Sequence, residues 1–359
     1  MNSKSAIIIL NWNGWEDTIE CLESLYQITY PNYNVIVVDN GSEDDSIEKI
    51  KEYCEGKIIV ESKFFEYSSG NKPIKIIEYT REETETGRGE EREILDLPSN
   101  RKMILIKNEK NYGFAEGNNI GMRYALRALN PDYFLLLNND TVVEPHFLTE
   151  LVEVAQNDSN VGILGPKIYY YHEPQTIYFA GGMLLRRIGQ PFHIGLHQTD
   201  NGRYDRLRGA DFITGCALLI RSEVINKIGL LDPYYFAYNE DLDWCVRAKK
   251  AGYRIMFVPQ AKIWHKGTST LELMSPAYMY LTTRNRILFV RKNATILDFV
   301  LLFVPYFIAI RIIRPIFLFS IRRKWGVIKA LVAGIKDGIS NNPKNIEAEI
   351  LRMNQKRVV

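Results

Sequence analysis

Three short polar motifs in the first 140 residues each follow a run of apolar residues. They read Asn11-Trp12-Asn13-Gly14, Asp39-Asn40-Gly41-Ser42 and Asn138-Asn139-Asp140. Carboxylate and amide oxygens at such places can accept hydrogen bonds from a nucleobase or a ribose, or hold a hard divalent cation. One such motif would indicate only a turn, because Asp and Asn commonly follow strands. Three of them together predict a shared ligand site.

The elements that must position these motifs are short, continuous apolar runs rich in Ile, Val and Leu. They occupy residues 6–10, 35–38, 103–106 and 133–137. Such runs predict strands that are buried on both faces of a parallel sheet. Apolar residues at helical spacing lie between them, at Ile19, Leu22 and Leu25, at Ile47 and Ile50, and over residues 117–129. This alternation is typical of a doubly wound α/β fold, in which ligands bind beyond the carboxyl ends of the strands.

Two stretches depart from the alternation. Residues 56–102 separate the second helix from the third strand, and their segment 78–93 is almost wholly polar and without a period. We expect a solvated surface insertion there, with a hairpin of residues 57–60 and 74–77. In the less regular second half we expect strands at 162–171, 176–185, 211–220 and 255–259, and a helix at 241–250.

Composition and charge exclude several classes of protein. The chain has 359 residues, 46% hydrophobic and 25% charged, which excludes wholesale disorder. Its four cysteines form no CxxC, which excludes a disulfide scaffold and a cysteine zinc site and indicates a reducing compartment. The N-terminal apolar run is too short for a signal peptide. Residues 284–359 carry a net +11 and the rest a net −9, so the body is not expected to bind nucleic acid, and the tail is expected to meet an anionic membrane.

The composition changes again from Leu297. The sequence LDFVLLFVPYFIAI is strongly apolar, Arg311 and Arg314 interrupt it, and a basic cluster follows at 321–325. We expect Pro305 and Pro315 to break the helix, which leaves residues 299–310 too short to span a bilayer. Helices lying in the interface of an anionic membrane are the first interpretation. A re-entrant or spanning segment at 297–321 is the second, and an apolar contact between copies of the chain is the third.

A set of ordered motifs resembles family 2 glycosyltransferases of the GT-A fold. The resemblance is greatest to their rhamnosyltransferase and galactofuranosyltransferase-like branch, and it covers about residues 5–290 apart from the insertion. The motifs are IIILNWNG, VIVVDNGSEDDS, NYGFAEGNNIG, YFLLLNNDTVVEP, NEDLDWCVRAKKAGY and a later WH. This resemblance implies a GT-A domain at 1–283, with the polar insertion at 56–102. The membrane-associating tail is then 284–359.

The resemblance also implies the residues that bind a nucleotide-diphosphate sugar. Asp39 would contact the nucleotide base, and Asp140 and His265 would hold Mn²⁺ or Mg²⁺, which an acidic body needs in order to neutralise a diphosphate. Asn138 stands where the family usually has the first Asp of its DxD motif, so a hydrogen bond to the ribose is the role expected of it. The other residues expected to bind the donor are Asn11, Asn13, Gly113 and Asn118.

The acceptor hydroxyl needs a general base, and the resemblance places it at Asp241. Glu240 would orient the acceptor or its loop, and Asp243 is a rival for the role of base. Acidic residues that open a helix are also ordinary caps, which is the structural alternative. The expected function is inverting transfer of one sugar to a glycan or lipid-linked saccharide at the cytoplasmic face of the membrane. Tyr280, Arg284 and Asn285 would contact acceptor phosphate or anchor the tail.

Three other functions are alternatives to this expectation. A processive polysaccharide synthase shares the fold, but the Gln-x-x-Arg-Trp motif of such enzymes is missing from the sequence. A membrane-bound scaffold that binds sugar nucleotides without turnover is suggested only by Asn138. A sugar nucleotidyltransferase would need a Gly-rich phosphate loop, and residues 10–15 do not provide one.

Overall fold

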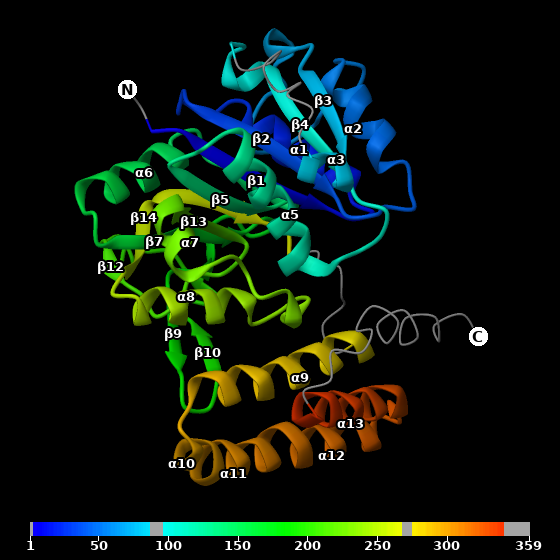
Figure 1. Ribbon diagram of the computed structural model, residues 1–359, viewed down its shortest axis with the longest axis vertical. Helices are drawn as coiled ribbons and strands as arrows, with labels where there is room; N and C mark the ends of the chain where they lie inside the picture. Colours follow the sequence, from blue (N-terminus) through cyan, green and yellow to red (C-terminus); the bar gives the residue numbers. More distant parts are fainter. Residues whose placement is uncertain (1–2, 87–95, 268–274, 341–359) are drawn as a thin grey trace.

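The computed structural model describes residues 3–86, 96–267 and 275–340. Within these residues, twelve strands form one mixed sheet with helices on both faces, and a layer of C-terminal helices lies below it (Figure 1). The strands of this sheet are β1 (Ser5–Asn11), β2 (Tyr33–Asp39), β3 (Lys75–Thr80), β4 (Lys102–Lys107), β5 (Tyr133–Asn138), β6 (Thr141–Val143), β7 (Val161–Tyr170), β8 (Thr176–Phe179), β11 (Gln198–Thr199), β12 (Arg208–Gly209), β13 (Ala217–Arg221) and β14 (Arg254–His265).

The first half of the sheet is parallel, in the order β3-β4-β2-β1-β5. Each of the four strands predicted there is present, and their apolar side chains are buried. The helices that connect and cover this half are α1 (Trp15–Leu25), α2 (Ser46–Cys54), α3 (Arg81–Thr86) and α5 (Gly113–Ala128). The predicted doubly wound α/β fold is therefore confirmed.

The second half joins antiparallel strands to β5, in the order β5-β13-β7-β8-β11, and β14 runs parallel to β7. The strand predicted at 176–185 is two strands, because the chain turns at Gly181, whose φ is +98°. The separate ribbon after this turn consists of β9 (Gly182–Leu185) and β10 (Gln190–His193). Of the strand predicted at 211–220, only β13 forms. The helices of this half are α6 (Phe147–Asn157), α7 (Ser222–Ile228) and α8 (Glu240–Lys250).

The hairpin predicted within the insertion is wrong. Residues 57–60 form no strand, and residues 74–77 overlap β3, which pairs in parallel with β4 at the edge of the main sheet. This pairing buries Ile77 and Tyr79 in the core, which a free surface hairpin would leave in water. Residues 87–95 of the polar stretch lie outside the described residues.

The apolar C-terminal segment is one continuous helix, Ile296–Ile321, of 26 residues with a mean hydropathy of 2.3. The prediction that Pro305 and Pro315 break it is wrong. Two π-helical stretches, Phe299–Phe303 and Phe307–Ile313, each precede a proline-containing turn, and such wider turns accommodate a residue that lacks an N–H. The α-helical parts of this segment are α10 (Ile296–Asp298), α11 (Val304–Tyr306) and α12 (Arg314–Ile321).

Two more helices connect this segment to the sheet domain. Helix α9 (Pro276–Asn293) lies between the sheet domain and the apolar segment, and α13 (Trp325–Ser340) packs along α9 (Figure 1). The contact is close because two glycines of α13 face α9. A Cβ on Gly334 would lie 2.7 Å from the carbonyl oxygen of Tyr280, and one on Gly338 would lie 3.0 Å from the side chain of Ile287.

Gly334→Ala is expected to lower the free energy of unfolding by about 1–3 kcal/mol, because the added methyl group forces α13 away from α9. Urea unfolding followed by circular dichroism measures the change. The matched control is Gly326→Ala in the same helix, where the nearest atom is 3.9 Å away. The control is expected to leave stability unchanged or raise it by up to about 1 kcal/mol. Equal effects of the two substitutions would contradict the close packing.

Candidate active site

The ends of β1 and β2 form one buried hydrogen-bonded network. Asn11 lies opposite Asp39 in the register of the two strands, and its Nδ2 donates to Asp39 Oδ1 over 2.8 Å. Ser42 donates to the same carboxylate from its backbone N–H and from its hydroxyl, and Thr18 donates to Asn11 Oδ1. Asn11 and Asp39 are 0% and 1% exposed. The predicted pair is thus brought together and held in one orientation.

The other two predicted strand-end residues lie beside this network. Asn138 ends β5 and lies opposite Leu10 in the register with β1. Its backbone N–H donates to the carbonyl oxygen of Cys216 over 2.9 Å. Asn13 has a positive φ of 49° and accepts a hydrogen bond from the N–H of Glu43, so it closes the turn after β1. The carboxyl ends of three neighbouring parallel strands therefore meet as the sequence predicts.

Asp140 and His265 form a buried pair at the same end of the sheet. His265 ends β14, which pairs with β6 directly after Asp140, and Nε2 of His265 lies 3.1 Å from Asp140 Oδ1. Burial disfavours the imidazolium, but contacts with Cys216 and Asp140 outweigh it and raise the pKa of His265 well above 6.5. The Nδ1 atom of His265 is buried and has no hydrogen-bond partner.

A carboxylate oxygen and an imidazole nitrogen are donors that Mn²⁺ accepts. The described part of the chain holds no group of three or more His, Cys, Asp and Glu side chains placed for a metal ion, so the protein would supply few of the cation's ligands. The donor set fits a cation whose remaining ligands come from a bound diphosphate and water.

Glu240 and Asp241 open α8; Glu240 is buried and Asp241 is half-buried. Asp241 Oδ2 accepts from the N–H of Gly215 over 2.9 Å, and Oδ1 accepts from the N–H of Leu242 over 2.7 Å. Burial raises the pKa of Asp241 above its ordinary value of 3.8, although these backbone donors oppose the rise. Burial and the neighbouring Asp241 raise the pKa of Glu240 well above its ordinary value, and Glu240 Oε2 has no hydrogen-bond partner among the described residues. Burial thus favours the protonated form of Glu240 more strongly than that of Asp241.

Asp243, the rival candidate for the base, is bound to cations. It is 0% exposed, and its Oδ2 accepts from Arg247 Nε over 2.8 Å and from Lys292 Nζ over 2.9 Å. A carboxylate that is fully buried and bonded to two cationic side chains is not accessible to an acceptor hydroxyl. The geometry thus favours Asp241 over Asp243.

Gly113 and Asn118 have partners within the protein. A Cβ on Gly113 would lie 2.6 Å from the ring of Phe236, so its lack of a side chain makes room for that ring. Asn118 is 2% exposed, and its Nδ2 donates to the carbonyl oxygen of Phe114. These contacts place both residues in the packing of α5, and their role in donor binding stays a prediction.

Tyr178 and His193, which the sequence does not single out, adjoin the site, and three predicted residues on α9 have partners elsewhere. The ring of Tyr178 on β8 lies 5.1 Å from that of His265 and 5.2 Å from that of His193 on β10. From α9, Arg284 and Asn285 hydrogen bond to the loop before α8, whereas Tyr280 donates to Asp337 of α13. Strand pairing and helix packing across long sequence separations create these contacts. The sequence shows the residue types, histidine and tyrosine, but not which of these residues come together.

Comparison with known families decides the assignment. The family described as "Glycosyltransferase like family 2" matches residues 83–278, more than half of the chain, and "Glycosyl transferase family 2" matches residues 6–71. The chain belongs to glycosyltransferase family 2. This membership supports a glycosyl transfer function and agrees with the resemblance seen in the sequence.

Three relatives of this family 2 member are named for sugar transfer. A low-salt glycan biosynthesis hexosyltransferase of Haloferax volcanii is 29% identical over 51% of this chain and 58% of its own length. A dTDP-rhamnosyl transferase of Shigella flexneri is 24% identical over 54% of this chain and 64% of its own. An N-acetylglucosaminyl-diphospho-decaprenol L-rhamnosyltransferase of Mycobacterium tuberculosis is 28% identical over 37% and 47%. The matches support the rhamnosyltransferase-like branch, and they span about half to two thirds of these relatives.

Solved structures confirm the GT-A fold of this family 2 member. Staphylococcus aureus TarS aligns with a TM-score of 0.52 and 13% identity, covering 99% of this chain and 53% of its own. GalNAc-T7, solved with UDP, GalNAc and Mn²⁺, aligns with a TM-score of 0.50 and 15% identity, covering 78% and 47%. At these identities the likeness shows the fold alone.

Proposed function

We propose that this chain is an inverting, metal-dependent glycosyltransferase that moves one sugar from a nucleotide-diphosphate sugar to a glycan or lipid-linked saccharide. One observation carries the proposal. Adjoining residues connect the Asp140–His265 pair to Asp241, because Cys216 accepts from the N–H of Asn138 and Gly215 donates to Asp241. The candidate cation site for a leaving diphosphate and the Asp241 carboxylate are therefore linked through adjoining hydrogen-bonded residues.

The donor would lie across the strand ends. Asp39, oriented by Asn11 and Ser42, is suited to accept hydrogen bonds from the base, and Asn138 is suited to contact the ribose. Asp140 and His265 would hold Mn²⁺ or, second, Mg²⁺, which would neutralise the negative charge of the leaving diphosphate. The presence of UDP and Mn²⁺ in the solved GalNAc-T7 supports this class of donor for the fold.

Asp241 is suited to take the proton of the acceptor hydroxyl as its oxygen attacks the sugar carbon from the side opposite the diphosphate. A carboxylate whose pKa is raised by burial is a stronger base than an exposed one, and the N–H groups of Gly215 and Leu242 keep it ionised and fix its direction. Burial raises the pKa of Glu240 well above its ordinary value and so favours its protonated form, and its expected role is to donate a hydrogen bond that orients the acceptor or the loop.

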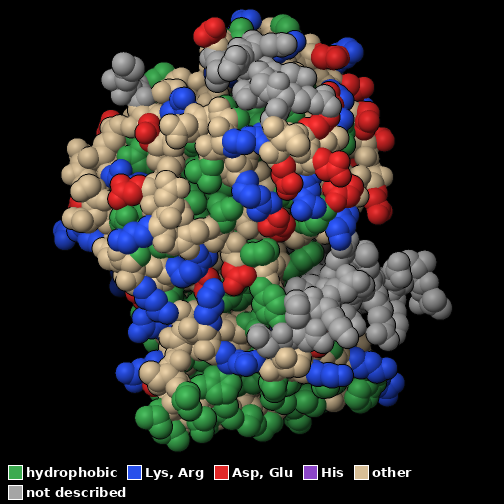
Figure 2. Space-filling view, in the orientation of Figure 1, with side chains coloured by type: hydrophobic (Ala, Val, Ile, Leu, Met, Phe, Trp, Pro, Cys, Tyr) green, Lys and Arg blue, Asp and Glu red, His purple; other side chains and the backbone are tan. Residues whose placement is uncertain are grey.

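The acceptor is expected at a membrane surface. The lower face of the molecule is apolar, and a belt of Lys and Arg side chains lies directly above it (Figure 2). Helix 296–321 supplies much of this face, with only 11% of its most apolar window buried, and exposed basic residues at 322–324 follow it. The same helix contacts α9, and its Asp298 pairs with Arg187 at the tip of the β9–β10 ribbon. Contacts on one side along its length favour a helix that lies in the interface over one that spans the bilayer.

All four cysteines are unpaired and buried, which agrees with a reducing compartment and hence with the cytoplasmic face of the membrane.

The donor site is tested by a thermal-shift screen of UDP-, dTDP- and GDP-sugars with and without Mn²⁺. One donor is expected to stabilise the protein only when Mn²⁺ is present, by about 2.7 kcal/mol at 100 times its Kd. Asp140→Ala is expected to abolish this stabilisation, and Asp205→Ala, an acidic residue bound to Lys167 away from the site, is expected to retain it. Stabilisation by a donor without transfer to extracted lipid or glycan acceptors would support the scaffold alternative. A donor-induced thermal shift that is the same without Mn²⁺ and in Asp140→Ala would contradict the metal site.

The assignment of the base is tested by two isosteric variants. Asp241→Asn is expected to lower kcat about 1,000-fold, because the amide cannot accept the acceptor proton. Glu240→Gln is expected to lower kcat less than tenfold, because a neutral amide resembles the protonated carboxyl that burial favours at this position. Initial rates of nucleoside-diphosphate release in the presence of acceptor measure both effects. A Glu240→Gln loss equal to or larger than the Asp241→Asn loss would exchange the two roles.

Membrane docking is tested by flotation with vesicles containing anionic or only neutral phospholipids. Leu301→Glu and Phe317→Glu, at positions 65% and 64% exposed, are expected to reduce binding to anionic vesicles at least about tenfold. Ile59→Glu, at a position 72% exposed on the sheet domain, is the control and is expected to bind like the wild type. Resistance of the bound protein to extraction at high pH would favour a spanning helix instead.

A further inference from the structure

The loop that leads into the general base has an unusual backbone. In Asp232–Asn239, here called the base loop, Phe236, Tyr238 and Asn239 have φ values of 63°, 72° and 76°. Non-glycine residues rarely adopt such angles, and they keep them only where surrounding contacts impose them. Since Glu240 and Asp241 follow directly, whatever imposes these angles also sets where the base lies.

The constraint comes from one side chain of α9. Asn285 is 0% exposed, and its Nδ2 lies 2.8, 2.7 and 2.8 Å from the carbonyl oxygens of Tyr235, Ala237 and Tyr238. Its Oδ1 accepts from Arg284 Nη1, which also donates to the carbonyl oxygen of Tyr234. Arg284 therefore fixes the direction of the amide, so that the N–H₂ group of Asn285 faces the base loop.

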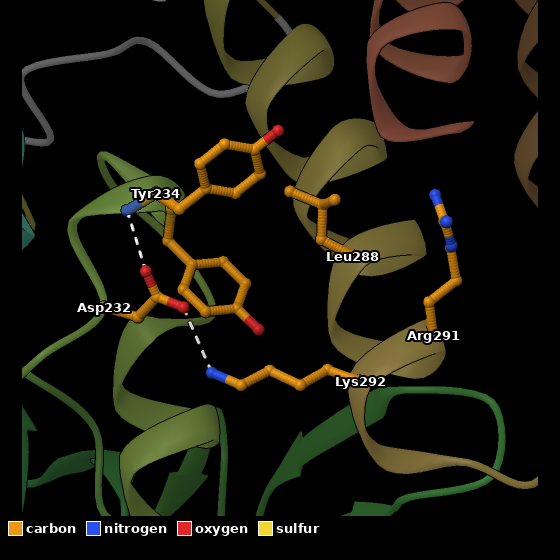
Figure 3. Close-up of a pocket in the computed structure, with 6 residues that line it drawn as sticks. Asp232, Tyr234, Leu288, Arg291 and Lys292 are labelled. Atoms are coloured by element: carbon orange, nitrogen blue, oxygen red, sulfur yellow. Dashed lines mark hydrogen bonds and ion pairs between the residues drawn. The ribbon is translucent and has the colours of Figure 1, made fainter. Parts of the chain in front are cut away.

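Lys292, two turns further along α9, contacts the first residue of the base loop and the helix that follows the loop. Its Nζ lies 3.1 Å from Asp232 Oδ2 and 2.9 Å from Asp243 Oδ2, the latter in the first turn of α8. A cavity of about 300 Å³ lies between α9 and the base loop. In Figure 3, Lys292 extends from α9 to Asp232, and Leu288 and Arg291 lie on the α9 side. The start, middle and end of the loop are thus all held from α9.

Among the described residues, the hydrogen bonds to the Asp241 carboxylate come from backbone N–H groups, including those of Gly215 and Leu242. Its place therefore depends on where α8 begins, and α8 begins where the base loop ends. We propose that Asn285 is a positioning residue for Asp241, which acts by fixing the carbonyl groups of the base loop. This inference rests on the proposed function, since it takes Asp241 to be the base.

The direct test is Asn285→Asp, which keeps the size of the side chain, removes both N–H donors and faces a carboxylate with three carbonyl groups. Its kcat is expected to fall about 100-fold, because a misplacement of the base by about 1 Å costs a factor of this size. The donor KM and the Mn²⁺-dependent thermal shift by the donor are expected to stay within twofold, because the hydrogen bonds of Asn285 go to Arg284 and the base loop and not to the strand ends. The control is Asn293→Ala on the same helix. Asn293 donates to the carbonyl oxygen of Phe289 and accepts from Lys250 at the last turn of α8, neither of which lies in the base loop, so its rates are expected to equal those of the wild type.

Lys292→Gln keeps the inference testable if Asn285→Asp does not fold, because the Lys292 side chain is 41% exposed. It is expected to lower kcat about tenfold with the donor KM unchanged. A folded Asn285→Asp variant with kcat within twofold of the wild type overturns the inference. Equal losses of kcat and donor binding also overturn it, because they indicate general loss of structure. If the wild type transfers no sugar, or Asp241→Asn stays active, the proposed function fails instead, so the two failures are distinguishable.

Discussion

The register of β1 against β2 and β5 is the constraint on which the rest of the site depends. It places Asn11 opposite Asp39 and Leu10 opposite Asn138. A slip by one residue would send each side chain to the other face of the sheet. The strands are apolar on both faces, so their pattern alone resists a slip weakly. Their polar ends resist it strongly, because a slip would draw a carboxylate or an amide into the core. The residues suited to bind the ligand are thus also the residues that fix the register.

The parallel half of the sheet was predictable because buried strands have a local signature. A short continuous Ile, Val and Leu run followed by Asp or Asn is visible in any window that contains it, and each of the four runs forms a strand. The hairpin at 57–60 and 74–77 failed for the complementary reason. Residues 74–77 could pair with a neighbouring segment or with β4, and the outcome depends on whether β4 has a free side in the sheet. That cannot be seen locally, because β4 lies about 30 residues away in the sequence.

The candidate site was predictable to the extent that its chemistry resides in side chains. Asp39, Asp140, Asp241 and His265 could be found by residue type and by the motifs around them. The partners of Asn285 could not, because they are backbone carbonyl groups 47 to 50 residues earlier, and every residue has one. Pro305 shows the same limit, since the sequence reveals the missing N–H but not the π-helical turns that accommodate it.

Helix α9 spans residues 276–293 and so crosses the boundary predicted at 283/284 between the glycosyltransferase domain and the tail. One face of it holds the base loop through Asn285 and Lys292, while Tyr280 and the region facing Gly334 bind it to α13. The tail is therefore not an exchangeable module. A different membrane anchor could be grafted only after residue 293, and it would have to supply its own counterpart to the two glycines of α13. Under the proposed function, attachment to a surface and the order of the base loop would therefore be inherited together.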